Sequence, residues 1–199
     1  VWHVGVVQLF WQLVARGELS GPQQWTEPAR PTDDQLLAWF RTGAETAVDA
    51  LAGLDPERPA WTWGRRHDVG FICRRVAQET AVHGWDALSA VAADEPIEQC
   101  IAADGVDEFL DEVLPGLSPD LAGPAQTVGL CASDVGTDWT IRAGDGAAVL
   151  TRGRLGADVT VTATASDLLL LLWGRRPADG LQVDGEPAAL QRLLARARF

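Results

Sequence analysis

The chain has 199 residues, of which 47% are hydrophobic, and its formal net charge is −12 at pH 7. This length suffices for one large domain or two small ones with buried cores. No run of Lys or Arg forms a basic stripe, which argues against nucleic acids and anionic membrane surfaces as main partners. The three cysteines, Cys73, Cys100 and Cys131, are odd in number and widely spaced, which indicates a reducing, cytoplasmic location rather than a disulfide framework.

The start of the chain has no recognisable signal peptide, and the longest apolar run, 168–173, is too short to span a membrane. The chain contains no methionine, and Val1 already lies inside an apolar pattern typical of a helix. We therefore expect a further N-terminal segment before the first helix of this sequence.

The first half of the chain has a helical pattern. Apolar residues at helical spacing predict helices over 1–17, 33–53 and 71–92, separated by Pro- and Gly-rich loops. Gly17 is expected to end the first helix and Thr32 to cap the second. The apolar face predicted for the second helix comprises Leu36, Leu37, Phe40, Ala44, Ala47, Val48 and Leu51. Three such helices predict a four-helix bundle that lacks its first member.

The second half has a different pattern. A helix is predicted over 97–114, followed by strands over 127–132, 138–143, 147–151 and 159–163. A helix that Ser166 would cap is predicted to extend to Trp173, and a last helix covers 186–197. Strands and helices in separate runs predict an α+β domain, so we expect a helical domain over 1–96 and an α+β domain over 97–199.

Glu79 and His83 are four residues apart on a predicted helix, so their side chains project from the same face. A carboxylate and an imidazole at this spacing can bind one metal ion, although most such pairs are solvated or bonded to each other. His3 lies in an otherwise apolar helix, where a polar group is costly unless it is satisfied. It is either a third ligand or a core histidine bonded to a backbone carbonyl or to Asp86. Two imidazoles and a carboxylate would leave open coordination positions, as catalytic metal sites do.

Other polar residues could assist such a site. Asp86, three residues after His83, either holds the imidazole or lies at the surface. Arg75, four residues before Glu79, is expected to form a helix salt bridge and is a cofactor-binding candidate. Arg175 and Arg176 are catalytic candidates that could clamp a substrate carboxylate, or they could satisfy the C-terminal end of the preceding helix.

Several segments together carry a family resemblance. They are HVGVVQLFW (3–11), RRVAQETAVHGWDA (74–87), IAADGVDEFL (101–110), the D-x-G-x-x-W-T pair (134–140), SDLLLLLWGRRP (166–177) and VDGEPAAL (183–190). The chain resembles, over essentially its whole length, the mycothiol-dependent maleylpyruvate isomerase family of actinobacteria. The resemblance implies a DinB-like bundle, whose first helix is absent from this sequence, and a sterol-carrier-protein-like second domain. It also implies that His3, Glu79 and His83 hold a divalent metal, usually zinc.

The resemblance further implies a cytoplasmic enzyme that uses mycothiol as thiol cofactor on a small electrophilic, carboxylated substrate such as maleylpyruvate. An arginine of the second domain would contribute to the active site, with Arg175 or Arg176 as the candidates. The sequence departs from the family pattern at Gln78, where relatives often have a non-ligating His, and at Gly84. Two other functions stay open: a non-catalytic small-ligand or metal-binding module with an apolar cavity in 97–199, and a regulatory bundle that binds a protein partner.

Overall fold

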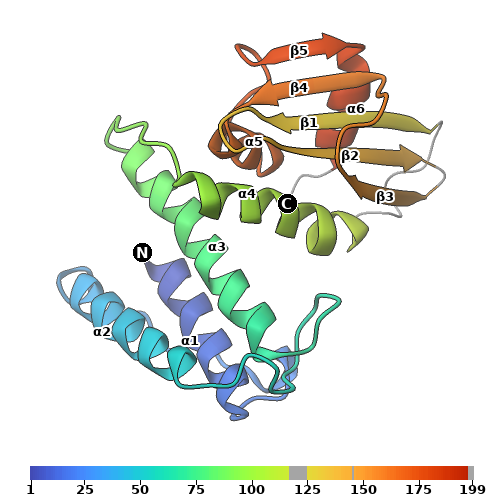
Figure 1. Cartoon of the computed structure of the whole chain (residues 1–199). Helices are drawn as coiled ribbons and strands as arrows, with labels where there is room; N and C mark the ends of the chain where they lie inside the picture. Colours follow the sequence, from blue (N-terminus) through green and yellow to red (C-terminus); the bar gives the residue numbers. More distant parts are fainter. Residues whose placement is uncertain (117–124, 145, 197–199) are drawn as a thin grey trace. The chain divides into compact units, whose positions relative to one another are not determined.

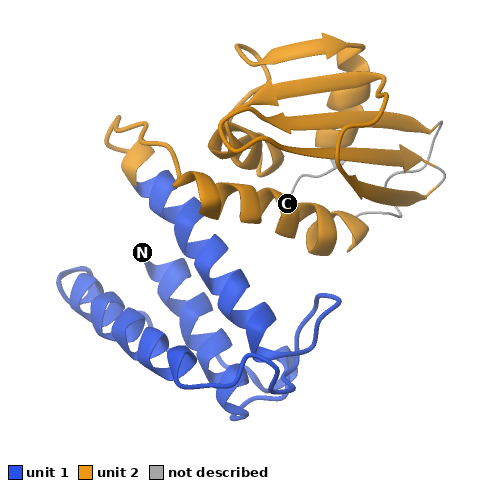
Figure 2. Ribbon diagram, in the orientation of Figure 1, with its two compact units in different colours: residues 1–87 blue, residues 88–199 orange. Residues whose placement is uncertain are grey.

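The structure is a computed structural model that describes residues 1–116, 125–144 and 146–196. The chain forms two compact units, Val1–Ala87 and Leu88–Phe199 (Figure 2). None of the helices formed by these residues is both long and apolar enough to cross a membrane.

The first unit is helical, as predicted. It consists of α1 (Trp2–Arg16), α2 (Asp33–Ala52) and α3 (Val69–Ser89), the last of which continues just past the end of the unit (Figure 1). A short 3-10 turn, Pro22–Gln24, interrupts the first connection, and an isolated bridge between Pro59 and Asp68 closes the second.

Local sequence explains where these helices begin and end. Gly17 ends α1 in the left-handed conformation, with φ 79°, and its N–H donates to the carbonyls of the last turn. Asp68 caps α3, because its Oδ1 accepts a hydrogen bond of 2.8 Å from the N–H of Phe71. Thr32 occupies the N-cap position of α2 as predicted, but its side chain makes no capping hydrogen bond.

The core of the first unit lies between α1 and α3. Its buried members are Trp11, Val14, Ala15, Val69, Phe71 and Ile72. α2 packs against α1 at a close approach, because a Cβ on Gly5 would lie 2.4 Å from the ring of Trp39. The apolar face predicted for α2 is wrong in part, since Leu37 is 59% exposed and Val48 66% exposed. α1 covers only a narrow stripe of α2, and Ala47 is its one buried residue.

The second unit is the predicted α+β domain. Its elements are α4 (Gln99–Glu108), a π-helical turn (Phe109–Val113), β1 (Gln126–Ala132), β2 (Thr137–Gly144), β3 (Ala147–Arg152), β4 (Val159–Ala163), α5 (Ala165–Leu172), β5 (Gln182–Gly185) and α6 (Pro187–Arg196). The five strands form one sheet in the order β3-β2-β1-β4-β5 (Figure 1). β1 and β4 are parallel, and the other neighbours are antiparallel. α5 and α6 pack on β1, and α4 packs on α5.

Three details of this unit differ from the predictions. The N-cap of α5 is Thr164, whose side chain accepts from the N–H of Asp167, whereas Ser166 is buried inside the helix and its Oγ accepts from the N–H of Ile97. The predicted helix over 97–114 changes to π-helical geometry at Phe109. β5 was not predicted, because a four-residue, mostly exposed edge strand has no apolar alternation to reveal it.

Candidate metal centre

The first unit brings three ligand-type side chains together. His3 lies in the first turn of α1, and Glu79 and His83 lie one turn apart on α3. The Oε1 of Glu79 is 3.0 Å from the Nε2 of His3 and 3.1 Å from the Nε2 of His83. One ligand atom from each residue lies within 4.8 Å of the other two.

The spacing of α1 against α3 sets this convergence. Glu79 and His83 meet because residues four apart share a helix face. The side-chain amide of Gln8 on α1 donates to the hydroxyl of Thr80, the neighbour of Glu79 on α3, at 3.1 Å, which links the two helices close to this point. Gln8 and Gln12 are buried in α1, and the sequence prediction missed them. A polar residue inside an apolar helix, which singled out His3, was also the available signal for these two.

The two contacts of Glu79 Oε1 have the separation expected of ligands to one divalent ion. Two ligand atoms ~2.1 Å from one ion, at tetrahedral or octahedral angles, are separated by roughly 3.0–3.4 Å. Both contacts of the Glu79 oxygen fall in or near this range. The rings of His3 and His83 are nearly perpendicular, at 79°, with centroids 5.0 Å apart, and the Nε2 atom of each lies near the same oxygen of Glu79.

Both ring nitrogens of His83 contact carboxylate oxygens. Its Nδ1 lies 2.8 Å from the Oδ2 of Asp86, and its Nε2 lies 3.1 Å from the Oε1 of Glu79. A neutral imidazole has one N–H and can donate to only one of these oxygens, whereas an imidazolium can donate to both. An ion at Nε2 would satisfy the neutral ring, because Nδ1–H then donates to Asp86, the usual arrangement for metal-bound histidines. Of the two roles left open for Asp86, the structure favours holding the imidazole.

The site is open on one side and closed on the other. The side chain of His3 is 63% exposed, so solvent and small molecules reach the ligand atoms from α1. On the inner side the Nη2 of Arg75, a buried side chain, lies 3.4 Å from the Oε2 of Glu79, which is the predicted salt bridge. The two oxygens of Glu79 therefore have different surroundings: Oε1 faces the histidines and Oε2 faces the guanidinium.

Arg175 and Arg176 belong to the second unit, at the C-terminal end of α5. The Nη1 of Arg175 donates to the carbonyl of Trp173 at 2.9 Å, in keeping with the predicted helix-end role. Arg176 forms ion pairs of 2.8 Å with Asp94 and with Asp167. These pairs anchor the arginine to the chain segment before α4 and to α5.

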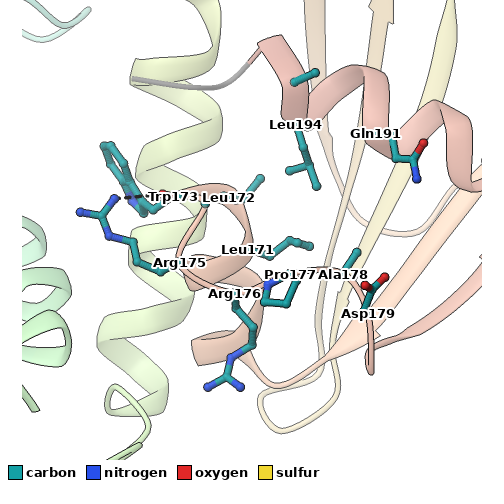
Figure 3. A pocket seen from close by; sticks show the side chains of 12 residues that line it. Leu171, Leu172, Trp173, Arg175, Arg176, Pro177, Ala178, Asp179, Gln191 and Leu194 are labelled. Atoms are coloured by element: carbon teal, nitrogen blue, oxygen red, sulfur yellow. Dashed lines mark hydrogen bonds between the residues drawn. The ribbon is translucent and has the colours of Figure 1, made fainter. Parts of the chain in front are cut away.

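The arginines also line a hollow of about 820 Å³ between the end of α5 and α6 (Figure 3). Leu171 and Leu194 contribute apolar surface to this hollow, and Gln191 and Asp179 contribute polar atoms. In Figure 3 the side chain of Arg176 points away from Gln191 and Leu194.

Two family models match the chain, one for each half. The model described as "Mycothiol maleylpyruvate isomerase N-terminal domain" matches residues 1–88, and "MDMPI C-terminal domain" matches residues 101–192. The chain belongs to the mycothiol maleylpyruvate isomerase family. The predicted membership is thereby confirmed, and the matched ranges include the three ligand-type residues and both arginines.

Similarity to solved structures is weak. A structure described as "UbiJ-SCP2 Ubiquinone synthesis protein" is 22% identical with a TM-score of 0.34, covering 46% of this chain and 85% of that one. The inverting sec-alkylsulfatase Pisa1 from Pseudomonas sp. is 18% identical with a TM-score of 0.42, covering 81% of this chain and 29% of that one. These scores support no conclusion about function. No curated protein matches the chain.

Proposed function

We propose that this member of the mycothiol maleylpyruvate isomerase family is a metal- and thiol-dependent isomerase or thiol transferase for a small, electrophilic, carboxylated substrate. The observation that carries the proposal is His83, whose two ring nitrogens each face a carboxylate oxygen while its Nε2 and the Nε2 of His3 both lie near the same oxygen of Glu79. A divalent cation among these atoms, proposed to be zinc, would satisfy all of them.

Each residue of the centre has a distinct part. His3, Glu79 and His83 would hold the ion, and Asp86 would fix the tautomer of His83 by accepting from Nδ1–H. When bound, such an ion supplies a Lewis acid that favours the thiolate form of a thiol cofactor at neutral pH. The exposed edge of His3 leaves the ligand atoms accessible to a low-molecular-weight thiol, proposed to be mycothiol.

The proposed isomerisation uses the thiol without consuming it. The thiolate adds to one carbon of a conjugated cis double bond, forming a C–S bond and moving the π electrons onto the neighbouring carbonyl oxygen. The remaining single bond then rotates, and the enolate electrons re-form the double bond in the trans arrangement as the C–S bond breaks. Arg175 and Arg176 are the proposed binding groups for the substrate carboxylate, since a guanidinium can bind a carboxylate through two parallel N–H bonds.

Activity against maleylpyruvate, with and without mycothiol, tests this proposal. We expect turnover only when mycothiol and a divalent ion are both present, and a loss of at least a hundredfold in His83→Ala. His67→Ala is the matched control, because His67 is exposed in a loop of the same unit and its Nδ1 lies 3.3 Å from the hydroxyl of Thr62, away from the proposed centre. Equal activity in wild type and His83→Ala would contradict the proposal.

A second candidate function rests on the hollow beside α6. Its volume of about 820 Å³ is in the range of small-molecule pockets, and it combines leucine surface with arginine and glutamine. The unit could therefore bind an amphipathic carboxylate without turning it over. Titration of the full chain with decanoate, followed by NMR, would support this function if the shifts centre on Leu171 and Leu194, and a lack of shifts there would exclude it.

A further inference from the structure

Arg75 is the charged residue packed most tightly beside the proposed centre. Its side chain is only 5% exposed, and its Nη2 lies 3.4 Å from the Oε2 of Glu79. A guanidinium keeps its positive charge at any pH that a protein tolerates. Burying that charge costs free energy unless an acidic or polar group compensates it. Glu79, one turn further along α3, supplies one acidic partner.

The two oxygens of the Glu79 carboxylate have different neighbours. Its Oε1 is shared by two imidazole nitrogens at 3.0 and 3.1 Å, whereas its Oε2 faces Arg75 on the inner side of α3. A glutamate side chain is long and rotates readily, and its carboxylate can bind an ion through one oxygen or two. A donor fixed on Oε2 turns that oxygen away from the histidines.

We propose that Arg75 is a positioning residue, which holds Glu79 so that the carboxylate offers Oε1 alone to the divalent ion. This inference depends on the proposed metal site. Its consequence is chemical: a carboxylate bound through one oxygen leaves more coordination positions for the thiol and for substrate or water.

Cobalt-loaded protein tests the inference without relying on turnover. Co²⁺ replaces zinc in nitrogen and oxygen sites, and its visible absorption weakens as the number of ligands rises. We expect Arg75→Gln and Arg75→Met to show weaker visible bands than wild type. Two variants are used so that a folding failure in one leaves the other to test the inference. Binding of 2-mercaptoethanol, followed by the sulfur-to-cobalt charge-transfer band, should weaken about tenfold, the order typical of losing an outer partner at a metal site.

Two further variants separate the positioning role of Arg75 from the effect of removing any positive charge. Arg41→Gln removes the same charge from an exposed position on α2 and should keep the wild-type spectrum and thiol affinity. Arg75→Lys retains a positively charged donor. Its cobalt spectrum and thiol affinity should lie between those of wild type and Arg75→Gln. Folded, cobalt-loaded Gln and Met variants with wild-type spectra and thiol affinity within twofold would overturn the role of Arg75. Wild-type protein that binds no cobalt would instead overturn the proposed metal site.

Discussion

Asp86→Asn perturbs the contact between Asp86 and His83 while keeping the size and shape of the side chain. The Oδ2 of Asp86 lies 2.8 Å from the Nδ1 of His83, within the range of charge-assisted bonds. Such bonds contribute about 1.5–3 kcal/mol, roughly twice the value of neutral ones. An asparagine oxygen can still accept a hydrogen bond, so about half of this contribution is lost. Asp86 is 34% exposed, which favours the lower part of the range, so the expected loss is ~1 kcal/mol. Since 1.4 kcal/mol is a factor of ten in affinity, we expect zinc to bind about fivefold more weakly.

Competition against a chromophoric chelator at fixed pH measures this change directly. Asp49→Asn is the control, because it removes the same charge from an exposed position on α2. A zinc affinity unchanged by Asp86→Asn, with Asp49→Asn also unchanged, would refute the idea that Asp86 orients a metal-binding imidazole.

Three further outcomes follow from the packing. Gly5→Ala should destabilise the first unit by about 1–3 kcal/mol in urea unfolding, because the new Cβ would meet the ring of Trp39 at 2.4 Å. Thr164→Ala should cost about 1 kcal/mol by the same measurement, through loss of the α5 cap. In native protein at pH 8, Cys100 should react with a thiol reagent well before Cys131, because Cys100 is exposed and burial raises the pKa of the Cys131 thiol. The stability gained by keeping Cys131 neutral is present below the ordinary thiol pKa of about 8.5 and should fall as pH rises above it.

Elements with a strong periodic signal could be predicted from the sequence, and so could the grouping of His3, Glu79 and His83. The predicted helices of the first unit agree with α1, α2 and α3 to within three residues at each end, because long amphipathic patterns with glycine and proline boundaries leave little choice. His3 was a candidate because a polar residue in an apolar helix is costly when it is buried. Its side chain is instead 63% exposed, and its Nε2 lies 3.0 Å from the Oε1 of Glu79.

What the sequence could not supply depends on contacts between distant segments. Leu37 and Val48 are exposed because α1 covers only a narrow stripe of α2. The sequence of α2 alone does not show how wide that stripe is. The cap of α5 could be assigned to Thr164 or Ser166 on propensity alone, and the bond from Ile97 to Ser166 decides between them. The opposite surroundings of the two Glu79 oxygens likewise require the register of α1 against α3.

X-ray absorption at the zinc edge of zinc-loaded protein tests the central claim most directly. One zinc per chain, with two imidazole ligands and oxygen ligands but no protein sulfur, is the predicted result, and it should disappear in His83→Ala while persisting in His67→Ala. Protein that binds no zinc, or that binds it equally well without His83, would contradict the assignment of His3, Glu79 and His83 as a metal centre.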